Sequence, residues 1–194
     1  VLMLMGLEGC LASNVDSMEW KGKNIQYFNR PTALFAQSAD CLPGFYKMIM
    51  QNESCYMFVT ALLPRGEASA FCTEGALGNG LVAVETELHH AFIVGQIVMQ
   101  RELRAPFNTL NQYWTSGSNV ADGTWTWTTT LRPFNYTKFW EGTGQDPSGF
   151  VSLYDNRASN PSLYYDWFPS FAVEEVHRSI CQHFIVNSDS KAES

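Results

Sequence analysis

Apolar residues follow two different periods along this chain, and the change between them separates helix-like from strand-like stretches. Residues 67–75 have helical spacing, and so does a longer stretch from Thr86 to Arg104. In the longer stretch Thr86 is a suitable N-cap, and one helical face carries Leu88, Phe92, Ile93, Gln96 and Ile97. The pattern predicts two helices, joined by a connector and a short strand over residues 77–84.

Short strands are predicted over most of the remaining sequence. Tyr56 and Phe58 alternate with smaller residues, and beyond Pro106 short stretches alternate with polar loops rich in Trp, Thr, Gly and Asn. Trp125 and Trp127 lie two positions apart, so both indoles should face the same side of a strand. The last core strands are predicted at residues 151–154 and 179–181. The fold class predicted from this pattern is α+β.

Composition limits the size and the partners of the protein. The chain has 194 residues, of which 45% are apolar and 16% charged, which fits one globular domain with a modest extension. The net charge of −7 comes without a basic run, so nucleic acid is not an expected partner. No run after the N-terminus approaches the 18 or so apolar residues that a transmembrane helix needs.

The N-terminus carries an apolar run, Val1 to Met5, followed by Cys10-Leu-Ala12. An apolar run that ends in a small-x-small triplet is typical of a secretory signal peptide, so residues 1–12 are predicted to be its remnant and the protein to be secreted. An ordinary apolar strand is the alternative, which Glu8 within the run favours slightly.

The cysteines agree with an oxidising compartment. There are five, and cleavage after Ala12 would remove Cys10 and leave four, which allow three pairings. If Cys10 is retained, an intermolecular disulfide becomes the competing expectation. Two sequons, at Asn52 and Asn135, are candidate N-glycosylation sites.

Three tryptophan-bearing runs stand in fixed order between Cys72 and Cys181: Trp114-Thr-Ser-Gly117, Gly123-Thr-Trp-Thr-Trp127 and Phe139-Trp140. In this order the sequence resembles the C-type lectin-like domain, in the form found in secreted invertebrate lectins. The resemblance implies two helices packed on small antiparallel sheets, with a long irregular loop region. It covers residues 41–184, which are predicted to be the domain. The polar, weakly periodic residues 13–40 are predicted to be an N-terminal arm or linker, and residues 185–194 a polar tail. The resemblance also implies the disulfides Cys41–Cys55 and Cys72–Cys181.

Sugar-binding members of that family hold a calcium ion in the long loop region, and the ligands of the ion also bind sugar hydroxyl groups. The resemblance implies Gln145, Asp146 and Asp166 as the metal ligands, with Asp155 or Asn156 as a further oxygen donor. Calcium takes six to eight oxygen ligands, so this set is small.

The order of residues in the calcium motif is also changed. In the family a proline stands between two ligands on a cis peptide bond, whereas here Pro147 follows both Gln145 and Asp146. Adjacent residues in an extended trans chain point to opposite sides. The sequence therefore predicts that the calcium site is weak or absent.

The resemblance also reveals a missing disulfide, because two further family cysteines are replaced here by Phe150 and Phe171. The loss removes a loop constraint worth about 2–4 kcal/mol. Contact between the two phenyl rings is predicted to offset part of that loss.

Catalytic motifs are not found in the sequence. His89 and His90 lack the His-Glu-x-x-His spacing of a zinc protease, and we expect them at the surface or rim of a helix. His177 and His183 flank Cys181, which is assigned to a disulfide. No Gly-x-Ser-x-Gly elbow or phosphate-binding loop is present, so the protein is expected not to be an enzyme.

Two functions remain open at this point. The first is a glycan-binding lectin with no certain cofactor beyond a weak calcium ion. It would use Gln145, Asp146 and Asp166 and would stack Tyr164 and Tyr165 on a sugar face. Binding would be shallow, so multivalency and an oligomer are expected. The second is a calcium-independent module for an extracellular protein partner, in which the same tyrosines form a contact patch. A structural role in a matrix or coat is a third option.

Overall fold

The structure is a computed structural model that describes residues 14–30, 32–50, 53–104, 111–140, 143–145, 149–155, 165–170 and 174–185. The first half contains β1 (Val15–Trp20), β2 (Lys23–Phe28), β3 (Phe35–Ala36), β4 (Tyr46–Met48), β5 (Ser54–Pro64), α1 (Arg65–Ala70), the π-helical turn η1 (Phe71–Gly75), β6 (Gly80–Leu81) and α2 (Glu87–Met99). The second half contains β7 (Gln112–Ser118), β8 (Thr126–Trp127), β9 (Arg132–Pro133), the 3₁₀ turn η2 (Thr143–Gln145), β10 (Phe150–Tyr154), β11 (Asp166–Ser170) and β12 (Val176–Phe184). The predicted α+β class is confirmed.

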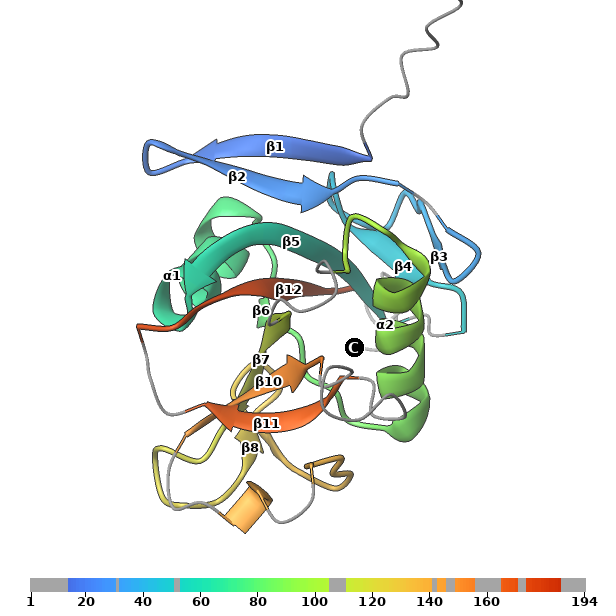
Figure 1. The fold of residues 1–194 in the computed structure, drawn as a ribbon. Helices are drawn as coiled ribbons and strands as arrows, with labels where there is room; N and C mark the ends of the chain where they lie inside the picture. Colours follow the sequence, from blue (N-terminus) through green and yellow to red (C-terminus); the bar gives the residue numbers. More distant parts are fainter. Residues whose placement is uncertain are drawn as a thin grey trace, which may run out of the picture.

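The strands form one hydrogen-bonded sheet in the order β1-β2-β5-β12-β7-β10-β11. Its centre is the long antiparallel pair of β5 and β12, and β12 is joined to β7 by a short parallel contact. Figure 1 shows the β1–β2 hairpin beyond β5 on one side and β7, β10 and β11 on the other, with α2 alongside. The segments of the chain richest in loops are therefore gathered on the β7–β11 side.

Both predicted helices are present, with small changes in their limits. The first is α1 followed directly by the π turn, which buries Phe71 and Cys72. The second begins after Thr86, whose side chain accepts a hydrogen bond from the backbone N–H of His89, as a cap does. It ends at Met99, five residues before the expected end at Arg104. No helix among the described residues is long and apolar enough to span a membrane.

The surface position expected for His89 and His90 is wrong. Their exposed fractions are 3% and 7%, whereas Leu88 is 51% exposed, so the buried face of α2 is displaced toward the histidines. Both rings have aromatic neighbours: His89 lies 5.2 Å from Tyr56, and His90 lies 6.5 Å from Trp167, between ring centroids. The buried face of the helix therefore combines the two histidine rings with the aliphatic Ile93 and Ile97.

The core divides into two clusters. The cross-linked core contains cysteines of both disulfides and includes Met57, Phe71, Cys72, Trp114 and Cys181. The aromatic core contains no cysteine among the described residues and includes Tyr56, Phe58, Ile93, Tyr113, Trp127, Tyr165 and Trp167. The two clusters lie on opposite faces of the central strands, because neighbouring residues of β5, such as Tyr56 and Met57, belong to different clusters.

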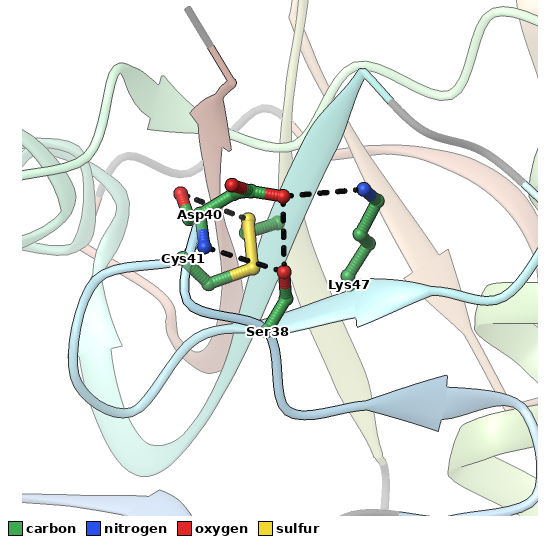
Figure 2. A network of polar contacts seen from close by, with 5 residues as sticks. Ser38, Asp40, Cys41 and Lys47 are labelled. Carbon is green, nitrogen blue, oxygen red and sulfur yellow. Dashed lines mark hydrogen bonds and ion pairs between the residues drawn. A yellow bond between two sulfur atoms is a disulfide. The ribbon is translucent and has the colours of Figure 1, made fainter.

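Both disulfides that the resemblance implied are present. Cys72–Cys181 joins η1 to β12, and Cys41–Cys55 joins the loop before β4 to β5. Figure 2 shows the second bond beside a polar network in which Asp40 accepts a hydrogen bond from Ser38 and pairs with Lys47 at 3.5 Å. The network fixes the loop that carries Cys41.

The lead-in over residues 13–40 contains strands that belong to the sheet. β1 and β2 form a hairpin whose turn residues, Lys21 and Gly22, both have positive φ (49° and 74°), as tight hairpin turns require. Tyr27 of β2 pairs with Val59 of β5, and the Trp20 ring lies 5.6 Å from Phe71. The domain boundaries at residues 12, 40 and 184 stay predictions.

Candidate functional site

The base of the loop region is a packed group of aromatic rings. Trp125 and Trp127 face the same side, as predicted, because both indoles stack on Phe134 at centroid distances of 5.7 and 4.1 Å. Trp167 of β11 contacts Trp127, Phe134 and Phe139 at 5.2, 5.2 and 5.6 Å. This group gives the loops a rigid floor.

The turn η2, which ends at Gln145, is attached to that floor. The indole N–H of Trp125 donates a hydrogen bond to the carbonyl of Gly144 (3.0 Å). A Cβ atom at Gly144 would lie 2.6 Å from Phe139, so the close approach requires glycine. The turn also lies against β11, which begins at Asp166. The structure thus brings the backbone of Gln145 beside that strand, while the Gln145 side chain and Asp146 lie outside the described part.

Tyr165 does not have the role that the sequence predicted. Its side chain is fully buried, and its hydroxyl accepts a hydrogen bond from Nδ2 of Asn111 (2.7 Å). Its carbonyl bonds to Nε2 of His90 (3.0 Å), and its backbone has a positive φ of 52°. Burial leaves no ring face for a sugar, so the stacking prediction is wrong for Tyr165. Tyr164 lies outside the described residues.

Asp166 is also largely buried, with 7% of its surface exposed, and it pairs with Tyr154 in the ladder between β11 and β10. Asp155 is 8% exposed, and Asn156 lies outside the described residues. In the described ranges, no three His, Cys, Asp or Glu side chains converge in a way that could hold a metal ion. The described residues alone therefore do not form a calcium site. Asp146 lies outside them, so a weak or absent calcium site stays a prediction.

Phe150 stands where the resemblance implied a lost cysteine. Its ring is half-buried and lies under the guanidinium of Arg65, 3.9 Å from the ring centroid. Burial lowers the pKa of Arg65 to about 10. A cation–π contact is therefore one replacement for the missing cross-link. The expected partner Phe171 lies outside the described residues.

Three partly exposed rings form a row that sequence reasoning missed. Tyr154 and Phe168 lie on the neighbouring strands β10 and β11, with ring centroids 5.3 Å apart, and Trp140 lies 6.3 Å beyond Phe168. The angles between successive ring planes are 40° and 34°. We call Trp140, Phe168 and Tyr154 the aromatic row. The motif Phe139-Trp140 was visible in the sequence, but the alignment of the two strands that completes the row was not.

The row has a fixed backbone beneath it. The amide of Trp140 donates to the carbonyl of Trp167 (3.0 Å), and the amide of Trp167 donates to the carbonyl of Lys138 (2.8 Å). Ser152 pairs with Phe168 across the strands, and its hydroxyl donates to Oε1 of Gln112 (2.9 Å). Polar groups of defined orientation therefore lie beside the rings.

No family model matches the sequence, and no curated protein sequence matches it. Solved structures are similar to it at low identity. The calcium-independent C-type lectin SPL-2 from Saxidomus purpuratus is 20% identical, with a TM-score of 0.60, and the match covers 76% of this chain and 96% of that one. The structure of SPL-1 in complex with GlcNAc is 22% identical, with a TM-score of 0.59 and coverage of 74% and 95%. Human lithostathine is 18% identical, with a TM-score of 0.57 and coverage of 74% and 99%. The chain therefore has the C-type lectin-like fold.

Proposed function

We propose that this protein is a non-catalytic lectin that binds glycans on the loop side of the domain without a tightly bound calcium ion. Support comes from the shared fold, since SPL-1 is described in complex with GlcNAc and SPL-2 is described as calcium-independent. It also comes from the scarcity of metal ligands among the described residues.

The aromatic row is the observation that carries the proposal. The C–H face of a pyranose ring packs well on an aromatic ring, and binding sites combine such apolar surface with a few fixed polar groups. Trp140, Phe168 and Tyr154 supply three adjacent rings, and the partly exposed Gln112 is held nearby by the buried hydroxyl of Ser152. The row takes over the stacking role that the buried Tyr165 cannot fill.

The expected binding is weak for each site, because a shallow row of rings encloses little of a sugar. Useful avidity then needs several sites on one assembly, and an oligomer would supply them. Gel filtration with light scattering measures the number of copies.

We also propose that the protein is extracellular and glycosylated. Two disulfides persist best in an oxidising compartment. Asn135 and Thr137 of the second sequon are exposed, so an oligosaccharide transferase could reach them. Asn52 lies outside the described residues.

A glycan array in millimolar calcium, repeated with chelator, tests the function. We expect the same glycans to be bound in both buffers. Tyr154→Leu should weaken binding about tenfold, the cost of one lost aromatic contact, whereas Tyr154→Phe should keep it because the ring remains. Leu131→Ala is the control, since Leu131 is 81% exposed and lies outside the row. Binding that disappears with chelator would contradict the calcium-independent mode.

A calcium-independent site for a protein partner is the second candidate. The observation that favours it is the partial exposure of Trp140 and Tyr154, because tryptophan and tyrosine are common anchors of protein interfaces. If no glycan on the array is bound in either buffer, a protein partner is favoured over a glycan.

A further inference from the structure

The face of the sheet that carries the aromatic row extends beyond the row itself. Phe150 and Tyr154 are an even number of positions apart on β10, so both side chains project to the same face. Phe168 lies opposite Ser152 and belongs to that face as well. Phe150 and Phe168 are thus diagonal neighbours, a relation in which residues of adjacent strands are about 7–8 Å apart. The face of the row therefore continues to Phe150.

A guanidinium group lies at this end of the face. Arg65, the first residue of α1, places its Cζ atom 3.9 Å from the centroid of the Phe150 ring. The attraction between the cation and the ring uses the π electrons of the ring and satisfies none of the N–H donors of the guanidinium. Those donors still need an acceptor.

Arg65 has no such acceptor within the described part of the chain. It forms no hydrogen bond or ion pair there, and its Nε is buried without a partner. Of its nitrogen atoms only Nε is buried in this way, and the residue is partly exposed, so Nη1 and Nη2 face solvent. Burial lowers the pKa of Arg65, and no described carboxylate raises it. Charges taken out of water are normally paired, so a counter-ion is missing here.

The carboxylates at this end of the face do not serve as that counter-ion. Oε2 of Glu175 accepts a hydrogen bond from the hydroxyl of Ser170 and lies 3.1 Å from Nε2 of His177. Glu174 is exposed, so water and salt screen its charge. Both glutamates weaken the attraction of an anion at long range. The energy for binding an anion must therefore come from direct hydrogen bonds to the guanidinium.

The other end of the face also offers a donor. Gln112 of β7 pairs with Tyr154, and its Oε1 accepts a hydrogen bond from the hydroxyl of Ser152 (2.9 Å). This bond orients the amide, and Nε2 donates to no described residue. Donors at both ends, with rings between them, suit a glycan whose oxygens act as acceptors.

We infer that Arg65 forms an anionic subsite at the end of the aromatic row, where Nη1 and Nη2 bind a carboxylate or sulfate group of an acidic glycan. A planar guanidinium binds such groups through two parallel hydrogen bonds. The subsite rests on the function proposed for the row, because the rings hold the neutral part of the glycan.

Matched pairs of oligosaccharides test the inference by surface plasmon resonance. Each pair has the same length and linkages and ends either in glucose or in glucuronate, and a third member carries a sulfate ester on the terminal glucose. At least one acidic member should bind about tenfold more tightly than the neutral one, as expected for a charge-assisted bidentate contact. The tighter of the two acidic members identifies carboxylate or sulfate as the group bound. Equal or tighter binding of the neutral member would overturn the inference.

Two arginine variants separate a direct contact from the general effect of charge. Arg65→Met keeps an apolar side chain on the Phe150 ring and should abolish the preference for acidic glycans, with neutral binding retained. Arg132→Met is the control, since it changes the net charge equally at a residue that is 69% exposed and pairs with Glu85. A preference that survives Arg65→Met, or that falls equally in both variants, would refute the subsite. Thermal melts check that the variants are folded, and Arg65→Lys, which keeps the charge without the planar fork, should retain only part of the preference.

Failure of the subsite and failure of the row give different results. Tyr154→Leu should weaken acidic and neutral glycans alike, because both use the rings, whereas Arg65→Met should affect only the acidic ones. Binding of both classes without a preference would refute the subsite and leave the function of the row intact. Absence of binding to either class would overturn both.

Discussion

The cross-linked core and the aromatic core are stabilised in different ways. Both disulfides contribute cysteines to the first, whereas the central pair of β5 and β12 has one face in each core. The second depends on ring contacts around Trp167 and on the buried face of α2. The aromatic row and the turn η2 lie next to the second core.

The difference shows where this domain can vary without losing its fold. Cross-links hold the ends of the domain together however the intervening loops change, whereas the loop side depends on packing, which a single substitution alters. We therefore expect a binding surface that tolerates changes of sequence on the loop side, next to the aromatic core.

Removing the long-range disulfide should have the largest effect. The pair Cys72→Ala and Cys181→Ala opens a loop with a sequence separation of 109, so we expect a loss of about 5 kcal/mol in the free energy of unfolding. The pair Cys41→Ala and Cys55→Ala, with a separation of 14, should cost about 3 kcal/mol. Urea unfolding compares the two, and an equal cost would mean that loop length does not set the stabilisation.

Truncating one buried indole in each core should come next. Trp167→Ala and Trp114→Ala should each destabilise the protein by about 4 kcal/mol, because both side chains are fully buried. Only Trp167→Ala should abolish glycan binding, measured at a temperature where both variants are folded, since Trp167 supports the strand beneath the row. Loss of glycan binding in Trp114→Ala as well would show that binding depends on both cores and not on the aromatic core alone.

Acid should weaken the aromatic core through His89. Burial lowers its pKa to about 4, against about 6.5 when unfolded, so the unfolded chain binds more protons between these values. Stability contributed by the neutral imidazole is complete above about pH 6.5 and decreases as the pH falls toward 4, by about 3 kcal/mol in all. Urea unfolding from pH 7 to 4 should give a shallower decrease for His89→Leu, and parallel curves would exclude His89 as the cause.

The contact that replaces the missing cross-link should have the smallest effect. Phe150→Ala removes a half-buried ring and its cation–π contact with Arg65, and should cost about 2 kcal/mol. Phe150→Leu keeps apolar volume and should cost about 1 kcal/mol. Thermal melts compare them, and an unchanged melting temperature in both would show that the ring contributes nothing to the cross-linked core, against which it packs.

Features carried by local spacing were predictable from the sequence. Thr86 caps α2, and Trp125 and Trp127 face one side, because capping and strand alternation involve residues only a few positions apart. The order of the tryptophan runs and cysteines implied both disulfides through the family resemblance.

Features that depend on contacts between distant segments were not predictable. Tyr165 was expected to stack on a sugar, yet it is buried in the aromatic core beside Tyr113, and Asn111, 54 residues away, bonds its hydroxyl. His89 and His90 were expected at the surface or rim of a helix because they lack metal-site spacing, but both are buried, with the rings of Tyr56 and Trp167 as neighbours.

By itself the sequence determined the fold class, the helices and the α+β arrangement, since these follow from periodicity and from the order of Trp and Cys. Only the tertiary structure decided which rings face solvent. The pairing of Ser152 with Phe168 and of Tyr154 with Asp166 aligns two strands so that Tyr154, Phe168 and Trp140 become neighbours. Exposure is a property of the assembled surface, because it depends on which distant segments cover a side chain.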